Sequence, residues 1–139
     1  MTGEPSGATT PEDLADARAV LAANEAFYAA FNTKNADAME ACWARSFPVA
    51  CTHPGWNAIE GREGVLDSWR AIMANPEQPR VFTGAAQAFV RGELAFVLCR
   101  ELVSGAPLSA TNVFVLEDGA WRIAHHHSSM VAFVPGGLV

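Results

Sequence analysis

Three of the four histidines of this chain stand in a row in WRIAHHHSSM, residues 121–130, and the fourth is His53, directly before Pro54. An imidazole titrates near neutral pH, so it can act as a general acid or base. It is also a common zinc ligand. A leftover purification tag does not fit, because tags stand at chain ends and an apolar tail follows this run.

The chemistry open to the run depends on the face that each ring occupies. Side chains of a strand alternate between faces, so His125 and His127 share one face with Trp121, whereas His126 lies on the other. His125 and His127 can be buried structural imidazoles, can hold a polar ligand, or can join His53 in the three-ligand set of a catalytic zinc site. No acid stands at a convincing position to orient such ligands, and we expect no metal.

Length and composition indicate one domain. The chain has 139 residues, half of them hydrophobic, and a net charge of −6 with nine dispersed basic residues. This charge argues against nucleic acids and membrane surfaces as partners. We expect residues 1–9 to be disordered and residues 10–139 to form the domain. Three cysteines without close spacing, no signal peptide and no apolar run of membrane length predict free thiols in a cytoplasmic protein.

The first half of the chain has helical periodicity. Thr10 can cap a first helix with Pro11 at its first position and Asp13 in a capping box, and the NTKN segment ends that helix. Asn35 can cap a short second helix, FPVACTHPGW reads as a strand, and EGREGVLDSWRAIM has the apolar face of a third helix.

Residues 80–130 change to strand patterns. Four runs, at 80–90, 93–103, 108–117 and 120–130, are separated by turn residues, including the hairpin pair Asp118–Gly119. The order predicts an α+β fold in which helices cover one face of an antiparallel meander. Residues 94–99 and 113–116 are apolar on both faces. The helices can cover only one face, so we expect a second copy of the chain on the other, giving a homodimer.

Three segments together resemble the nuclear transport factor 2-like superfamily, which includes SnoaL-like cyclases and ketosteroid isomerases. They are FYAAFNTKNADAM, THPGWNAIEGREGV and EDGAWRIAHHHSS. The ending W-x-x-x-H-x-H-x-S also resembles the association domain of calmodulin-dependent kinase II. The resemblance implies a cone-shaped curved sheet with three helices packed on its concave side, enclosing a pocket. It also implies a domain without metal or cofactor.

The resemblance assigns positions to the pocket. His53 stands where ketosteroid isomerases carry a catalytic aspartate, Phe27 where they carry an oxyanion tyrosine, and Asn112 where they carry a second oxyanion donor. On a regular helix Tyr28 would point elsewhere. Because Phe27 cannot donate a hydrogen bond, steroid isomerisation is not expected. The family pattern places the face of His125 and His127 toward the pocket.

Two functions of different classes follow from these positions. In the first, the cone binds a small, mostly apolar molecule. His53 is its acid or base, Asn112 and one of His125 or His127 are polar anchors, and Phe27 and Trp56 are apolar walls. In the second, the chain is a non-catalytic module for oligomerisation or partner binding. A cavity that His53 lines favours the first, and a cavity filled by Trp56, Phe27 and Met39 favours the second.

Overall fold

The computed structural model describes residues 10–132, so the predicted disordered segment 1–9 lies outside the described residues. In chain order the elements are α1 (Pro11–Asn32), α2 (Ala36–Cys42), β1 (Ala50–Thr52), β2 (Ile59–Glu60), α3 (Arg62–Ala74), β3 (Val81–Arg91), β4 (Leu94–Val103), β5 (Ala106–Glu117) and β6 (Ala120–Met130). The predicted α+β fold is confirmed. Within the described part of the chain, no helix is both long and apolar enough to cross a membrane.

The helix starts follow the predicted caps. The hydroxyl of Thr10 accepts the backbone N–H of Asp13, and the Asp13 carboxylate accepts the backbone N–H of Thr10, which completes the capping box of α1. The side chain of Asn35 caps α2 through the N–H of Ala38. These local bonds fix where α1 and α2 begin.

The sheet is curved and has six strands in the order β2-β1-β6-β5-β4-β3. Strands β3 to β6 form the predicted antiparallel meander, and the hairpin at Asp118–Gly119 has positive φ at both residues, as a tight two-residue turn requires. β1 adds to the meander in parallel with β6, which pairs Cys51 with His126. This parallel pairing brings the segment that ends at His53 beside the histidine run.

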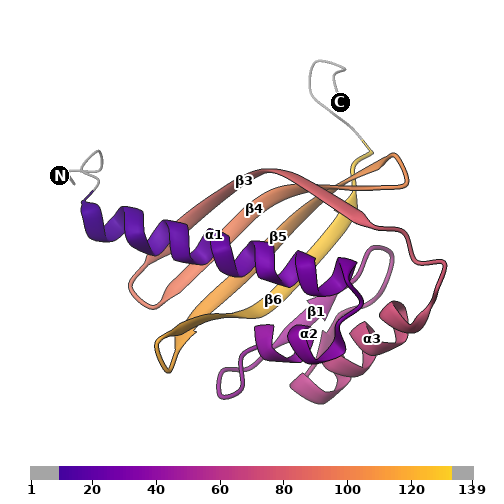
Figure 1. The fold of residues 1–139 in the computed structure, drawn as a ribbon, viewed down its shortest axis with the longest axis horizontal. Coiled ribbons are helices and arrows are strands. Elements are labelled where there is room, and N and C mark those ends of the chain that lie inside the picture. Colours follow the sequence, from indigo (N-terminus) through magenta and orange to yellow (C-terminus); the bar gives the residue numbers. More distant parts are fainter. Residues whose placement is uncertain (1–9, 133–139) are drawn as a thin grey trace.

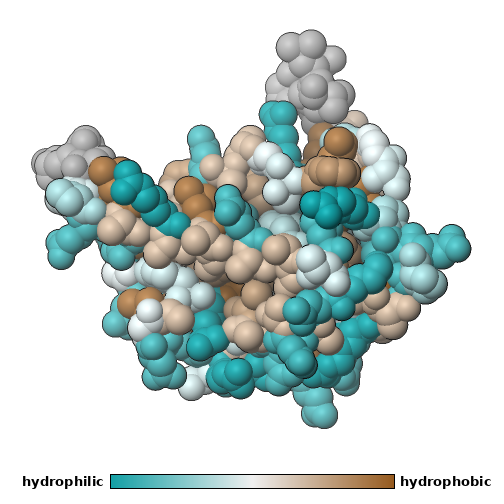
Figure 2. Space-filling view, viewed as in Figure 1, coloured by the Kyte–Doolittle hydropathy of each residue, from teal (hydrophilic) through white to brown (hydrophobic). Residues whose placement is uncertain are grey.

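The helices cover one face of the sheet. α1 crosses that face diagonally, and α2 and α3 close one end of it beside β1 (Figure 1). On this side of the molecule, hydrophilic residues surround a pale band that follows α1 and reflects the alanines on its exposed side (Figure 2).

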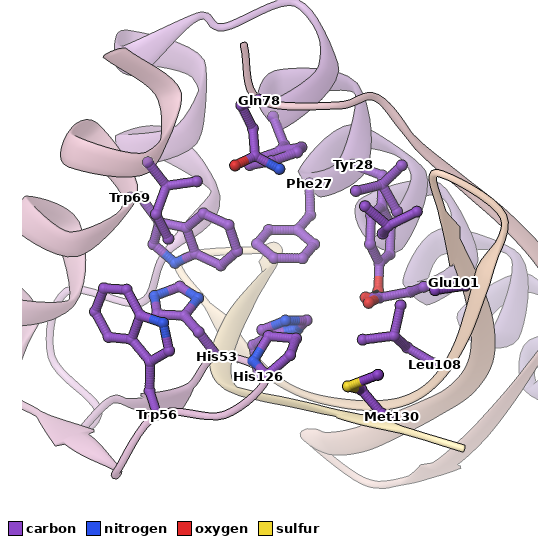
Figure 3. A pocket seen from close by; sticks show the side chains of 16 residues that line it. Phe27, Tyr28, His53, Trp56, Trp69, Gln78, Glu101, Leu108, His126 and Met130 are labelled. Atoms are coloured by element: carbon purple, nitrogen blue, oxygen red, sulfur yellow. Dashed lines mark hydrogen bonds between the residues drawn. The ribbon is translucent and has the colours of Figure 1, made fainter. Parts of the chain in front are cut away.

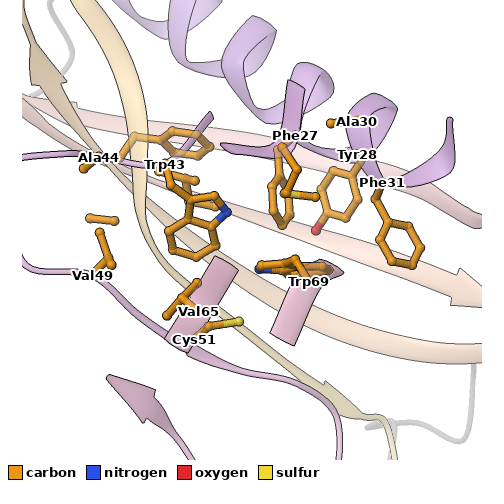
Figure 4. Close-up of a cluster of buried hydrophobic side chains, with 14 of the residues drawn as sticks. Phe27, Tyr28, Ala30, Phe31, Trp43, Ala44, Val49, Cys51, Val65 and Trp69 are labelled. Carbon is orange, nitrogen blue, oxygen red and sulfur yellow. The ribbon is translucent and has the colours of Figure 1, made fainter. Parts of the chain in front are cut away.

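The core lies between α1, α3 and the sheet. Trp43 is fully buried, Phe27 is nearly so, and Phe27 packs edge-on against both Trp43 and Trp69 (Figure 4). Aromatic rings at such geometry add to the free energy gained from their buried area. This aromatic cluster fixes where α1 sits above the sheet, and therefore which side chains of α1 face the space beneath it.

Candidate functional site

A cavity of about 400 Å³ lies between the concave face of the sheet, α1 and α3. Its wall is mainly apolar, and its polar side chains come from different parts of the chain: Tyr28 from α1, His53 from the end of β1, Gln78 from the segment between α3 and β3, Glu101 from β4 and His126 from β6 (Figure 3). The apolar wall includes Phe27, Phe31, Trp56, Trp69, Leu108 and Met130. A few polar groups in an apolar hollow are typical of sites for small molecules.

His53 is held at the end of β1 by a tight turn. Pro54 and Gly55 form the turn, Gly55 has a φ of 83°, and the N–H of Trp56 donates to the carbonyl of His53 at 2.9 Å. The imidazole is 3% exposed and packs edge-on against Trp56 and Trp69. Burial lowers the pKa of His53 to about 4, so the ring is neutral at pH 7.

Ser68 of α3 determines which nitrogen of His53 carries the proton. The Ser68 hydroxyl donates to the carbonyl of Val65 at 2.7 Å, and its oxygen lies 2.8 Å from Nε2 of His53. A hydroxyl has one hydrogen, so Nε2 must donate to Ser68. Nδ1 then keeps its lone pair, and its nearest polar neighbour is the Cys51 sulfur at 3.9 Å.

His126, not His125 or His127, lines the cavity, and the predicted assignment of the pocket face was wrong at this point. A bulge in β6 is the reason. Val113 pairs with His125 and Phe114 pairs with Ile123, so Ala124 is an extra residue without a partner. Because of this residue, Ile123 and His126 both face inward, and the alternation that holds for Trp121 and Ile123 is inverted from His125 onward.

A chain of hydrogen bonds fixes the tautomer of His126. The carboxylate of Glu101 can only accept, so the phenol of Tyr28 donates to it at 2.5 Å. The phenol oxygen therefore accepts the amide N–H of Asn112 at 3.1 Å, and the same amide nitrogen donates to Asn24 at 2.8 Å. The amide oxygen of Asn112 then faces Nδ1 of His126 at 2.6 Å, which must carry the proton.

Nε2 of His126 is consequently the unprotonated nitrogen. Burial, together with the charges that the other three histidines would carry, lowers the pKa of His126 to about 3. The cavity therefore has two neutral imidazoles, whose ring centres are 6.5 Å apart.

Tyr28 reaches the cavity beside Phe27, contrary to the expectation that it points elsewhere. Neighbouring residues of a helix differ by about 100° in direction, and the apolar face of a helix on a sheet is at least that wide. Both rings therefore fit on the buried side of α1, where they pack edge-on with centres 4.9 Å apart. Burial and the nearby Glu101 carboxylate raise the pKa of Tyr28, so its phenol stays protonated.

Glu101 is a buried carboxylate in the cavity wall, 5% exposed. One oxygen accepts from Tyr28 and the other accepts the hydroxyl of Ser128 at 2.6 Å. Among residues 10–132, no basic side chain forms an ion pair with it, and the lining of the cavity contains no Lys or Arg.

Asn112 lies behind the cavity and not in its wall. It is fully buried, and the protein itself engages both ends of its amide. The predicted role as a direct ligand anchor therefore does not fit its position, because the amide oxygen of Asn112 faces Nδ1 of His126. Asn112 acts on the site through His126 and Tyr28.

His125 and His127 lie on the outer face of the sheet, with ring centres 6.1 Å apart. His125 is half-buried, with Nδ1 3.1 Å from the carbonyl of Ala50, and His127 is exposed. Since His53 lies on the inner side, these three rings do not form the three-ligand set considered from sequence. In the described part of the chain, no group of three or more His, Cys, Asp or Glu side chains is arranged to hold a metal ion.

Sequence reasoning missed four polar residues of the wall: His126, Tyr28, Glu101 and Gln78. A signal for Glu101 was present, because it is in phase with Ala95, Val97 and Cys99, the small and apolar residues that β4 buries. The opposite face of β4 is equally apolar in sequence, so this phase could not be assigned to the inside. For His126 no signal existed, since the bulge at Ala124 has neither Gly nor Pro.

Comparison with known proteins confirms the predicted superfamily. Residues 20–133 match the model of the SnoaL-like domain. A protein of the NTF2-like family from Streptomyces avermitilis, whose assignment as a dehydratase is provisional, has a structure that superposes with a TM-score of 0.81. It is 33% identical and covers 89% of this chain and all of its own.

Two further proteins are similar. A domain from Thiobacillus denitrificans, provisionally described as a calcium/calmodulin-dependent protein kinase type II association domain, is 32% identical, with a TM-score of 0.72 over 80% of this chain and 94% of its own. The F-box protein SKIP8 of Arabidopsis thaliana is 30% identical over 123 residues, or 86% of this chain. The chain spans only about half, 53%, of the length of this curated relative.

Proposed function

The chain belongs to the SnoaL-like domain family, and we propose that its cavity binds a small, mostly apolar molecule on which His53 acts as a general base. One observation carries the proposal: two neutral imidazoles, each held in one tautomer, border an apolar hollow of about 400 Å³. Neither Phe27 nor Trp56 fills this hollow, and Met39 is buried in the core away from it.

The geometry supports proton abstraction better than nucleophilic chemistry. The nearest thiol, Cys51, is held protonated because burial raises its pKa to about 12. His53, in contrast, has an unprotonated Nδ1 at neutral pH, since Nε2 donates to Ser68. A base fixed in an apolar hollow can remove a proton from carbon or oxygen, which is the first step of isomerisation, cyclisation or elimination of water. The provisional dehydratase assignment of the Streptomyces avermitilis protein agrees with this class of reaction.

His126 assists as a second acceptor, and Asn112 is a positioning residue. Asn112 holds His126 with Nδ1 protonated, so that its Nε2 remains free. An amide does not pass protons along readily, so the chain from His126 to Glu101 serves to hold geometry and not to relay a proton.

The base is tested with a simple carbon acid of suitable size, 2-tetralone. NMR in D₂O follows the exchange of its acidic protons with purified protein. We expect exchange above the buffer rate in the native chain, and a loss of at least about 100-fold in His53→Gln, the usual range for one acid-base group. His127→Gln, the same change on the outer face, should exchange at the native rate.

The pH profile adds a second test of the same base. With the pKa of His53 lowered to about 4, exchange should be flat between pH 5.5 and 7.5, whereas an unperturbed imidazole would lose half its activity near pH 6.5. Exchange that is unchanged in His53→Gln would refute the base and leave ligand binding as the function. If no apolar probe binds, both the general base and the ligand site are refuted.

A second candidate function is association through the outer face of the sheet. Six large apolar side chains of β3 and β4 are between 40% and 59% exposed and form what we name the outer patch: Phe82, Phe89, Leu94, Phe96, Leu98 and Leu102. We propose that a second copy of the chain covers this patch in a homodimer, because monomers rarely expose apolar surface of this extent. The similarity to an association domain supports this proposal, which is compatible with a ligand site on the other face.

A further inference from the structure

The polar groups around Glu101 and the two imidazoles present mainly hydrogen-bond acceptors to the cavity, whereas the amide of Gln78 and the indole N–H of Trp69 are donors elsewhere in the wall. The N–H of each imidazole is donated to the protein, to Ser68 from His53 and to Asn112 from His126. The phenol of Tyr28 donates to Glu101, and so does the hydroxyl of Ser128. A ligand group next to Glu101 or the two imidazoles therefore meets carboxylate oxygens or nitrogen lone pairs, and it must supply donors of its own there.

The charge of the cavity has one source. Both imidazoles are neutral at pH 7, because burial lowers the pKa of His53 to about 4 and that of His126 to about 3. No Lys or Arg belongs to the wall that residues 10–132 form, and Glu101 forms no ion pair with any of them. Two neutral donors are a weak replacement for water around a buried carboxylate, so a positive charge brought close to Glu101 is favoured strongly.

Aromatic rings provide the apolar part of the wall. Phe27, Phe31, Trp56 and Trp69 border the same hollow and offer apolar surface to the body of a ligand. In Figure 3, Glu101 and Tyr28 lie at one side of the cavity, His53 lies with Trp56 and Trp69 at the other, and His126 lies between them. A ligand with a charged end and an apolar body fits both sides at once.

We propose that the natural ligand of this cavity is an apolar ring compound that carries a protonated amine, and that Glu101 binds the amine. The inference deepens the proposed function, because it requires the cavity to be a ligand site. It places the cationic end at Glu101 and the apolar body among the aromatic rings. The part of the body next to His53 is where a proton would be removed.

Three probes with one ring system test the inference: 2-aminotetralin, which is a cation, 2-hydroxytetralin, which is neutral, and tetralin-2-carboxylate, an anion. Their dissociation constants are measured by NMR titration at pH 7 and low salt. We expect the amine to bind at least about tenfold more tightly than the alcohol, and the carboxylate to bind most weakly.

Glu101→Gln keeps the shape of the side chain and removes its charge. We expect it to weaken the binding of the amine about tenfold, to the level of the alcohol, with little effect on the alcohol itself. Glu93→Gln, the same change at an exposed residue between β3 and β4, should leave all three affinities unchanged. If Glu101→Gln does not fold, the order of the three dissociation constants on the native chain still decides whether the cavity prefers a cation.

The outcomes separate the two proposals. If the amine and the alcohol bind equally, or if the carboxylate binds more tightly, the proposal of a protonated amine as ligand is wrong. The cavity is then a site for neutral or acidic ligands. A preference for the amine that survives Glu101→Gln overturns the assignment to Glu101. If none of the three probes binds, both proposals are wrong: the protonated amine as ligand and the cavity as a ligand site.

Discussion

His126 and His127 are neighbours in β6, yet they lie in opposite environments. His126 is 3% exposed, faces the cavity and donates to Asn112, whereas His127 is exposed on the outer face of the sheet. The inner face combines a closed network of polar groups with an apolar hollow. The outer face combines the half-buried His125 and the exposed His127 with the outer patch of large apolar side chains.

The difference shows that the two faces use apolar surface in different ways. On the inner face, Asn112, His126 and Glu101 are buried and each has hydrogen-bond partners, because an unpaired buried group costs about 1–3 kcal/mol. On the outer face, Phe89 and Phe96 stack on each other with ring centres 4.8 Å apart while remaining 44% and 41% exposed. Such a surface is stable in water when another surface covers it.

The largest effect is therefore expected at the outer patch. Phe96→Glu puts a charge at its centre, and we expect the dissociation constant of the homodimer to rise about 1000-fold, equivalent to about 4 kcal/mol. Arg18→Glu, on the exposed side of α1, changes the charge by two units but should leave the dimer intact. Analytical ultracentrifugation measures both, and a native chain that is monomeric at micromolar concentration would contradict the prediction.

The inner imidazoles predict a pH dependence of stability. The folded pKa of His53 and of His126 lies below the value of 6.5 for an exposed imidazole, so the unfolded chain binds more protons as the pH falls below 6.5. The free energy of unfolding should therefore decrease with falling pH, by about 2 kcal/mol for each imidazole between pH 7 and pH 5.

Urea unfolding across this range measures the effect. His126→Gln should remove about half of the slope, while His127→Gln on the outer face should keep all of it. The carboxylates of Asp13 and Glu117, whose pKa values backbone N–H groups lower, stay ionised above pH 5 and do not contribute. A flat profile between pH 7 and pH 5 would show that the inner imidazoles are not held neutral by burial.

Asn112 provides the next test, because three buried partners depend on its amide. Asn112→Ala leaves Asn24, Tyr28 and His126 each without one partner, and we expect a loss of about 3 kcal/mol in the free energy of unfolding. Thr111→Ala, the adjacent residue on the other face of β5, should cost less than about 0.5 kcal/mol. Equal losses in the two variants would mean that water satisfies the inner network without the amide.

The fold could be predicted from the sequence because its signals are local and repeated. The capping box at Thr10, the change of hydrophobic period after residue 80 and the hairpin pair at Asp118 each depend on a few adjacent residues. The assignment of faces failed, because a single extra residue inverts it. Ala124 forms the bulge, and an alanine has no backbone preference from which a bulge could be predicted.

The candidate site was predictable only in part. His53 and Phe27, predicted from the resemblance, and Trp56, predicted as an apolar wall, all line the cavity, and their roles stay predictions. The inward direction of Glu101 could not be predicted, because residues 94–99 are apolar on both faces and the sequence does not indicate which face of β4 is buried. The partners of Asn112 lie on α1 and β6, far from it in sequence, and such contacts follow from packing alone.

The smallest expected effect concerns the tautomer of His53, and it tests how inner and outer imidazoles are held. The outer His125 has its Nδ1 beside a backbone carbonyl, that of Ala50, which no side-chain substitution removes. The inner His53 instead depends on the hydroxyl of Ser68. Ser68→Ala should cost about 1 kcal/mol in the free energy of unfolding, the typical value of one hydrogen bond, and should free both nitrogens of His53.

Imidazole ¹⁵N chemical shifts distinguish the two tautomers directly. In the native chain the shifts should report a proton on Nε2 of His53, and in Ser68→Ala they should report a mixture, while the shifts of His125 stay the same. Exchange of 2-tetralone should slow together with the fraction of rings that keep Nδ1 unprotonated. If Ser68→Ala keeps the Nε2 tautomer in full, the packing of Trp56 and Trp69 around the ring would be sufficient to orient the base, and the serine would serve only the helix.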